Sequence, residues 1–188
     1  MATNLVKVTE QTPIVWADTT DYTGTVSGLT RTAQIDLTSV ASNQARQGAK
    51  VDLGATRWPS YAVSLAVEIA SGAISGESVD VYWAESPSAT AGNANPGGVS
   101  GADAAYTGTA GDSLADSLKQ LLHIGSLITT ADQTTVVQYQ KIGVLNGESL
   151  LRYGSPVIYN GSTGAFLADA VEMYLAFTPI APDVQAAA

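Results

Sequence analysis

Apolar and small polar side chains alternate strictly along residues 61–69 (YAVSLAVEI). One face of this segment carries five large side chains: Tyr61, Val63, Leu65, Val67 and Ile69. The other face carries small residues and one carboxylate: Ala62, Ser64, Ala66 and Glu68. A period of two is that of a β-strand with one buried face, and burying each large side chain stabilises the fold by about 1.5–3 kcal/mol. The small face indicates either a closely packed neighbour or light solvation.

The same alternation recurs along the rest of the chain. The strong strand candidates are residues 77–83, 134–145, 155–160 and 170–177; the shorter ones are residues 13–16, 31–37, 48–53 and 122–128, the last with a bulge at Gly125. Residues 113–120 carry leucines at helical spacing after an N-cap at Asp112 or Ser113. Because crossover helices are missing, the pattern predicts an all-β, antiparallel two-sheet sandwich of the jelly-roll type, with an immunoglobulin-like sandwich as the alternative.

Glycine and proline predict how the strands are joined and where the sheet ends. Residues 71–76 contain two glycines and connect segments 61–69 and 77–83, which predicts that these two strands form an antiparallel hairpin. Pro179 and Pro182 predict the end of the sheet, because proline lacks the N–H group that a strand ladder uses.

Three departures from the alternating pattern divide the chain. Residues 1–45 form an N-terminal segment with isolated apolar groups, which predicts either edge strands with loops or an extended arm that packs on a partner subunit. Residues 46–182 form the sandwich body, and residues 183–188 form a tail. Within the body, residues 85–112 are mostly small and predict one long surface loop that lies on its own domain or on a neighbour.

Composition narrows the possible functions. The net charge is −9 without a cluster of Lys and Arg, so we expect no nucleic-acid partner. No apolar run approaches the roughly 20 residues of a membrane span, and no signal peptide opens the chain, so we expect no membrane partner and synthesis in the cytoplasm. Cysteine is absent, which excludes disulfides and thiolate chemistry. Only 13% of the residues are charged, which fits a surface that neighbouring subunits cover.

Candidate catalytic and binding chemistry is sparse. His123 is the only histidine, and no GxSxG motif positions a serine nucleophile, so we expect no enzyme, no cofactor and no metal. The aspartates near the long loop and the N-terminus match no calcium-loop spacing, and no carboxylate pair stands out as that of a glycosidase. Trp16 and Trp58 could line a sugar-binding face, which keeps a carbohydrate-binding β-sandwich as an alternative, whereas Trp83 has the position of a core residue.

Two runs and the C-terminal part of the chain resemble a group of tailed-bacteriophage virion proteins. The runs are GAKVDLGATRWPSYAVSLAVE at residues 48–68 and SVDVYWAESPSATAGNANPGGVSGADAAY at residues 78–106, and the C-terminal similarity extends from SLIT through RYGSPVIYN to TPI. This resemblance implies a structural protein associated with the capsid, most closely a head decoration (cement) protein with a β-sandwich body. It transfers no functional residues, because the group has no small set of them.

The resemblance and the irregular segments together predict an interface rather than an active site. The partners would be the major capsid protein or other virion proteins, and further copies of the chain, with a trimer favoured; the location would be the capsid surface of the virion. A tail or head-tail protein of the same virion is the alternative. The residues predicted to lie at interfaces come from residues 1–45 and 85–112: Trp16, Tyr22, Asn95, Pro96, Val99 and Tyr106.

Overall fold

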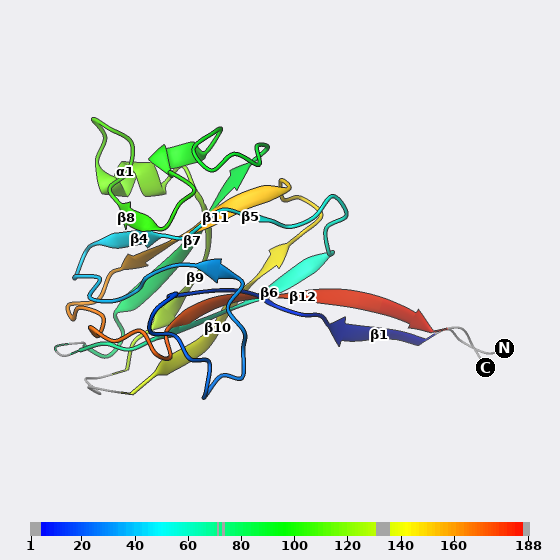
Figure 1. Ribbon diagram of the computed structural model, residues 1–188, viewed down its shortest axis with the longest axis horizontal. Helices are drawn as coiled ribbons and strands as arrows, with labels where there is room; N and C mark the ends of the chain where they lie inside the picture. Colours follow the sequence, from blue (N-terminus) through cyan, green and yellow to red (C-terminus); the bar gives the residue numbers. More distant parts are fainter. Residues whose placement is uncertain (1–4, 71, 73, 131–135, 186–188) are drawn as a thin grey trace.

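The computed structural model describes the chain except for residues 1–4, 71, 73, 131–135 and 186–188, and it contains two packed β-sheets (Figure 1). The first sheet has the order β10 (Gln138–Asn146), β6 (Ser60–Val67), β12 (Tyr174–Gln185), β2 (Ile14–Ala17) and β3 (Ala33–Gln34), and β1 (Leu5–Glu10) also pairs with β12. The second has the order β8 (Ala104–Tyr106), β4 (Ala45–Gln47), β11 (Tyr153–Asn160), β7 (Ser78–Ser86) and β9 (Leu122–Ile128), and β5 (Val51–Asp52) also pairs with β11. All described pairs are antiparallel except β2 with β3.

The strand order confirms the predicted two-sheet antiparallel sandwich. Its eight principal strands are β2, β12, β6 and β10 in one sheet and β4, β11, β7 and β9 in the other. Along these eight strands the chain passes to the other sheet at every step except from β7 to β9. Repeated crossing between sheets is compatible with the jelly-roll connectivity that the sequence predicts.

The main core fills the space between the sheets and is centred on three aromatic rings. Phe177 of β12 lies with its ring centroid 4.9 Å from that of Trp16 and 5.0 Å from that of Trp83, and all three side chains are fully buried. Edge-to-face and tilted aromatic contacts of this kind contribute about 0.5–1.5 kcal/mol each beyond the burial of their area. Trp83 is therefore a core residue, as predicted, and so is Trp16.

The predicted hairpin between residues 61–69 and 77–83 is wrong. β6 pairs with β10 and β12, whereas β7 pairs with β9 and β11 of the other sheet. Val63 and Leu65 of β6 and Val79 and Val81 of β7 belong to the same buried cluster. The two strands therefore face each other across the core rather than lying side by side, and an alternating pattern is the same in both arrangements.

The single predicted helix is confirmed near its predicted bounds. α1 (Leu114–Leu118) begins after Ser113, whose hydroxyl accepts a hydrogen bond from the backbone N–H of Asp116 at 3.1 Å. Leu118 and the following Leu121 pack in a second, smaller apolar cluster with Val157 of β11, on the outer side of the second sheet. The bulge predicted at Gly125 is also confirmed, since the β7–β9 register shifts there.

Residues 85–112 are more ordered than the sequence predicts. They contain the short 3-10 helix η1 (Pro96–Gly98) and the strand β8, which pairs with β4. The first half is held by the ammonium group of Lys50, which donates to the Ser86 hydroxyl and to three backbone carbonyl oxygens: those of Ser88, Thr90 and Asn93, at 3.1, 2.8 and 3.1 Å. The segment thus packs on its own domain and is organised by a residue outside it.

The predicted sheet end at Pro179 and Pro182 is also wrong, because β12 continues to Gln185 and pairs with β1. The backbone N–H of Gln11 donates to the carbonyl oxygen of Pro179 at 2.9 Å. Successive residues of a strand direct their backbone N and C=O groups toward alternate sides of the strand. Pro179 and Ala181 therefore direct these groups toward β1, and Pro182 directs its backbone groups toward the opposite edge of β12. That edge is open, since β6 begins at Ser60 opposite Ile180, and Pro182 therefore breaks no ladder bond.

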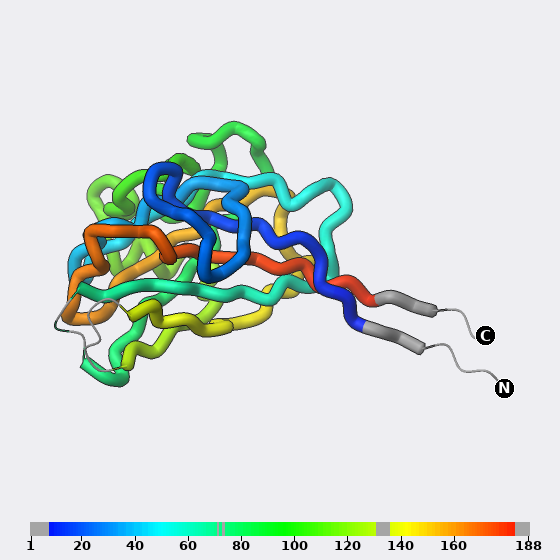
Figure 2. The backbone as a smooth tube through the Cα atoms, turned by 60° about the horizontal axis from the view of Figure 1, so that its bottom comes forward, coloured from blue at the N-terminus to red at the C-terminus, as the bar shows by residue number. Residues whose placement is uncertain are grey.

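The boundaries predicted at residues 45 and 183 change accordingly. β2 pairs with β12 and buries Val15, Trp16 and Ala17 completely, so the segment 1–45 contributes to the body. Only β1 behaves as an arm: with the C-terminal half of β12 it forms a two-stranded ribbon that projects beyond the sandwich (Figure 1). Figure 2 shows the first and last strands leaving the body next to each other.

Candidate functional site

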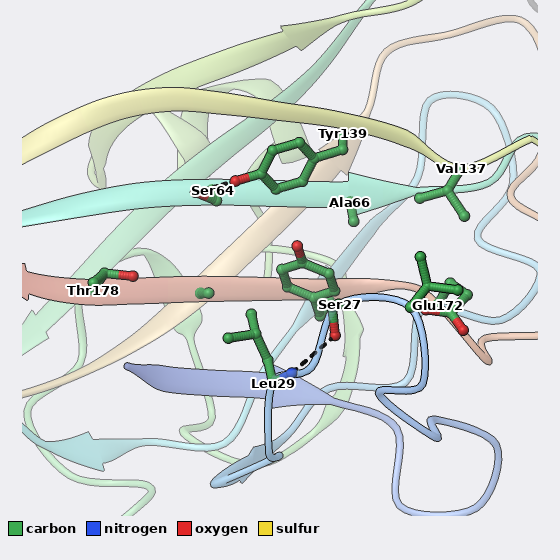
Figure 3. Close-up of a pocket in the computed structure, with 11 residues that line it drawn as sticks. Ser27, Leu29, Ser64, Ala66, Val137, Tyr139, Glu172 and Thr178 are labelled. Atoms are coloured by element: carbon green, nitrogen blue, oxygen red, sulfur yellow. Dashed lines mark hydrogen bonds between the residues drawn. The ribbon is translucent and has the colours of Figure 1, made fainter. Parts of the chain in front are cut away.

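A groove of about 370 Å³ lies on the outer face of the first sheet, between β10 and the loop that follows β2 (Figure 3). Its floor comes from β6 and β12, and its walls come from β10 and the loop. The lining residues are Val26, Ser27, Leu29, Ser64, Ala66, Val137, Tyr139, Glu172, Tyr174, Ala176 and Thr178.

The groove exists because small residues alternate on β6. Ser64 and Ala66 point outward there, and the register places Ser64 beside Ala176 and Ala66 beside Tyr174 of β12. Ala66 and Ala176 are almost fully buried beneath the surrounding walls. The face of residues 61–69 that carries small side chains is thus closely packed at Ala66. A closely packed neighbour was one of the two expectations for this face, and light solvation was the other.

Three tyrosine rings form a row across this face. The ring of Tyr174 lies 6.3 Å from that of Tyr139 and 6.1 Å from that of Tyr22, measured between centroids. Tyr139 is 61% exposed and its hydroxyl donates to the Ser64 hydroxyl at 3.3 Å, whereas Tyr174 is buried. The Tyr22 hydroxyl is 2.7 Å from that of Ser27. Tyr139 therefore offers an open aromatic face, and Tyr22 and Tyr174 hold the groove in shape.

The groove is acidic rather than basic. Burial, together with Tyr139, Tyr22 and Glu172, raises the pKa of Tyr174 to about 12. Burial also raises the pKa of Glu68, which continues the outward face of β6 beyond Ala66, and the carboxylates of Asp169 and Glu172 add to this shift. None of the residues that line the groove is Lys, Arg or His. Phosphate and other anionic ligands are therefore disfavoured here.

The side chains that line the groove can contact a ligand in three ways. An exposed aromatic ring, neighbouring hydroxyl groups and one carboxylate suit a flat, hydroxyl-bearing ligand. Glu172 is the only carboxylate in the lining, so the groove holds no pair of carboxyl groups of the glycosidase kind.

His123 lies outside the groove, on β9, in a cluster that resembles a catalytic triad only in composition. The Ser126 hydroxyl donates to Asp80 Oδ1 at 2.5 Å, while His123 Nε2 lies 3.4 Å from that hydroxyl and 4.0 Å from the same carboxylate oxygen. In a triad the imidazole lies between the serine and the carboxylate and takes the serine proton. Here the serine is bonded directly to the carboxylate, so the cluster is structural, and His123 is an exposed strand residue.

Three of the six residues predicted to lie at interfaces are buried within the chain. Trp16 belongs to the core between the sheets, and Val99 and Tyr106 belong to the cluster beneath α1. The Tyr106 hydroxyl also donates to the carbonyl oxygen of Gly97 at 2.5 Å. These three serve the fold, because the segments that contain them pack on the body. They leave no exposed side chain for a partner.

The other three predicted interface residues are partly exposed. Tyr22 packs beside Tyr174 next to the groove, and Pro96 begins η1. The side-chain amide of Asn95 donates to the carbonyl oxygens of Ala91 and Val99, each at 2.7 Å, and so closes the loop on itself. Of the tryptophans considered for sugar binding, Trp58 is 39% exposed and Trp16 is inaccessible.

Two of the acidic residues considered as ion ligands, Asp103 and Asp18, have structural partners. Asp103 accepts hydrogen bonds from Arg46 at 2.7 Å and from Gln34 at 3.1 Å, and so joins the N-terminal segment to the long loop. Asp18 accepts from the backbone N–H groups of Thr20 and Asp21. Within the described ranges, no group of three or more acidic or histidine side chains is placed to hold a metal ion. Nor does any helix there have the length and apolar character that a membrane crossing needs.

Tyr139 and Tyr174 are not among the residues predicted to bind a partner or ligand. Tyr139 falls between Gln138 and Gln140 in an alternating run, which already places it on the face opposite the core. The alternation alone could thus have indicated an outward Tyr139. The position of Tyr139 beside the small outward residues of β6 follows only from the pairing of β10 with β6, which the structure shows.

Comparisons of the chain with protein-family models, with curated proteins and with solved structures find no match.

Proposed function

We propose that the chain is a non-enzymatic structural protein of a tailed-phage virion, which decorates the head and stabilises the capsid lattice. The observation that carries the proposal, beside the sequence resemblance, is the ribbon of β1 and β12. It projects from the body, and its outer edges carry unpaired backbone groups. A two-stranded ribbon alone is only marginally stable in water, so an ordered ribbon of this kind is suited to lie on another protein.

The exposed side chains of the ribbon support attachment to a protein surface. Val8 of β1 is 71% exposed, and Thr9, Glu10 and Pro182 are exposed as well. A partner strand could pair with either outer edge, and main-chain hydrogen bonds would then supply the affinity. Many such contacts, repeated by the symmetry of a shell, would stabilise it even if each is weak.

The location is tested by purifying virions from the phage whose genome encodes the chain and labelling them with antibodies raised against it. Label on the head supports a decoration protein. Label on the tail or at the head-tail junction supports the alternative virion role. Particles free of the chain would overturn both.

The role of the ribbon is tested by two matched proline variants. Thr9 directs its N–H toward β12 because it lies two residues before Gln11, whereas Val8 directs its N–H outward. Thr9→Pro should therefore open the ribbon and reduce co-sedimentation with undecorated shells, and Val8→Pro should leave the β1–β12 ladder intact. Equal binding by wild type and Thr9→Pro, with the body folded in both, would exclude the ribbon as the attachment element.

A second candidate function, carbohydrate binding, is favoured by the tyrosine groove. An exposed Tyr139 ring beside hydroxyl groups and one carboxylate could stack on a neutral sugar. The test is a glycan array with wild type and Tyr139→Ala. Binding that Tyr139→Ala removes would support this function, and an array without any binding would reject it.

A further inference from the structure

One end of the tyrosine groove carries two carboxyl groups. Tyr174 and Ala66 are partners in the antiparallel register of β12 and β6. Glu172 comes two residues before Tyr174, and Glu68 comes two residues after Ala66. Because side chains two residues apart lie on the same face and the strands run in opposite directions, both carboxyl groups lie at the same end of the groove. We call this the acidic end.

The carboxyl groups at the acidic end have no ion-pair partner among the described residues. Glu68 is 9% exposed, and neither Glu68 nor Glu172 takes part in an ion pair there. Burial raises the pKa of Glu68, and Asp169 and Glu172 raise it further, because the negative charges repel one another. Lys141 of β10 lies opposite Ser64, toward the other end, and is not among the residues that line the groove. A bound cation would supply the positive charge that the described residues do not place within ion-pair distance.

The exposed ring of Tyr139 adjoins the acidic end and offers a surface for a flat cation. Tyr139 lies opposite Ala66 in the register, and its ring lies above β6 (Figure 3). Tyr139 and Glu172 both lie close enough to Tyr174 to raise its pKa. The face of an aromatic ring attracts a cation. A guanidinium group is planar, stacks on aromatic faces, donates two parallel hydrogen bonds to a carboxylate and is hydrated more weakly than an ammonium group. Tyr139 and Glu172 thus match a guanidinium group better than a neutral sugar, which would leave the carboxyl groups without a compensating charge.

We infer that the tyrosine groove is a binding site for a guanidinium-bearing ligand, with the cation stacked on the open face of Tyr139 and hydrogen-bonded to Glu172. Glu68 strengthens the negative potential at this end without touching the ligand, because its charge acts over a distance. The hydroxyl groups of Ser64 and Thr178, which line the groove toward its other end, can form hydrogen bonds with the rest of the ligand. The groove lies on the body and not on the ribbon, so the inference does not rest on the proposed virion role. It competes with carbohydrate binding for the same groove.

The test compares two probes that have nearly the same shape but different charge. N-acetylarginine amide carries the guanidinium group, and N-acetylcitrulline amide carries a neutral, planar urea group in its place. In an NMR titration at low salt, where screening is weak, the arginine probe should shift the signals of Tyr139 and of its neighbours on β6. It should bind about tenfold more tightly than the citrulline probe, or better. Equal affinity for the two probes, or the absence of saturable shifts at the groove, would overturn the inference.

Variants of the protein separate the roles of charge and ring. Glu172→Gln should weaken binding of the arginine probe by about tenfold or more. Glu148→Gln removes the same charge from an exposed turn outside the groove and should leave the affinity nearly unchanged. Tyr139→Phe should still bind the probe because it keeps the ring, whereas Tyr139→Ala should not; Tyr139 is 61% exposed, so neither substitution empties the core. Equal losses in Glu172→Gln and Glu148→Gln would assign the effect to net charge and overturn the site.

A third arm identifies the source of the guanidinium group. If a short peptide with one arginine between glycines and serines binds about tenfold more tightly than N-acetylarginine amide, the ligand is the arginine side chain of a protein. Equal affinity would support a free small molecule. A neutral glycan that binds wild type and Glu172→Gln equally well, at the groove, would overturn the inference in favour of carbohydrate binding. None of these measurements involves capsids, so failure here would leave the proposed decoration role to its own tests.

Discussion

The ammonium nitrogen of Lys50 lies 2.8 Å from the carbonyl oxygen of Thr90, forty residues later in the chain. The carbonyl oxygens of Ser88 and Asn93 and the Ser86 hydroxyl also lie within 3.1 Å of this nitrogen. An ammonium group has three N–H donors and no acceptor, so a set of oxygen atoms suits it. Burial lowers the pKa of Lys50, but the three carbonyl dipoles favour its charged form. A charged side chain next to β5 thus holds the first half of the long loop.

Lys50→Met should release this loop while keeping most of the apolar stem of the side chain. Losing four charge-assisted contacts, two of them with partly buried acceptors, should cost about 1–3 kcal/mol of unfolding free energy. Hydrogen exchange should increase first in residues 86–101. Lys119→Met is the control, because Lys119 forms an exposed pair with Asp116, which solvent screens, and the substitution should change stability little. Unchanged exchange in Lys50→Met would show that the loop is held by other contacts.

Gly125→Ala should strain the crossing of β9 and β10. The new Cβ atom would overlap the carbonyl oxygen of Ile142, and a backbone atom cannot move aside as a flexible side chain can. We expect a loss of about 1–3 kcal/mol in denaturant unfolding. Gly92→Ala has open space around the new atom and is the matched control. Equal stability of the two variants would mean that the crossing adjusts freely.

Glu68→Gln should stabilise the protein at neutral pH. Burial raises the pKa of Glu68, and Asp169 and Glu172 raise it further, so the charged form is disfavoured in the folded state. The penalty is fully present above the folded pKa and disappears as the pH falls below 4.5, the ordinary pKa of a glutamate, where the folded and unfolded forms are both protonated. The melting temperature of Glu68→Gln should therefore exceed that of wild type at pH 7 and converge with it in acid. Glu148→Gln, on an exposed turn, is the matched control for the substitution itself.

Tyr174 should make the protein sensitive to alkali. Its pKa rises from 10 to about 12 in the folded state, so between these values the unfolded chain loses a proton that the folded chain keeps. Stability is unaffected below pH 10 and falls through this window, by about 2 kcal/mol for Tyr174 alone. Tyr174→Phe should lose less stability than wild type on the same alkaline titration, followed by denaturant unfolding. Parallel curves for the two proteins would contradict the raised pKa.

The tyrosine groove shows the limit of inference from the sequence. Alternation places Ser64 and Ala66 on the face of β6 opposite its large side chains, and in the structure they lie on the outer face of the sheet, as Tyr139 does. These faces adjoin because β10 pairs with β6, although about seventy residues separate the two strands in the sequence. Pairing between distant strands depends on backbone hydrogen bonds that any sequence can make, so the side chains alone do not specify it.

The sequence by itself determined the all-β class, the buried face of β6, the core position of Trp83 and a short helix that begins near Asp112 or Ser113. Each follows from local periodicity or from a capping side chain, and local rules suffice for them. Only the tertiary structure decided that β6 and β7 face each other across the core, that Trp16 is buried, and that β12 continues past Pro179 and Pro182. These depend on which strands become neighbours. Pro182 is harmless because its missing N–H faces an open edge, and Pro179 lies opposite Gln11, between the end of β1 and the start of β2. An aromatic side chain in an irregular segment is buried once that segment joins the sheet.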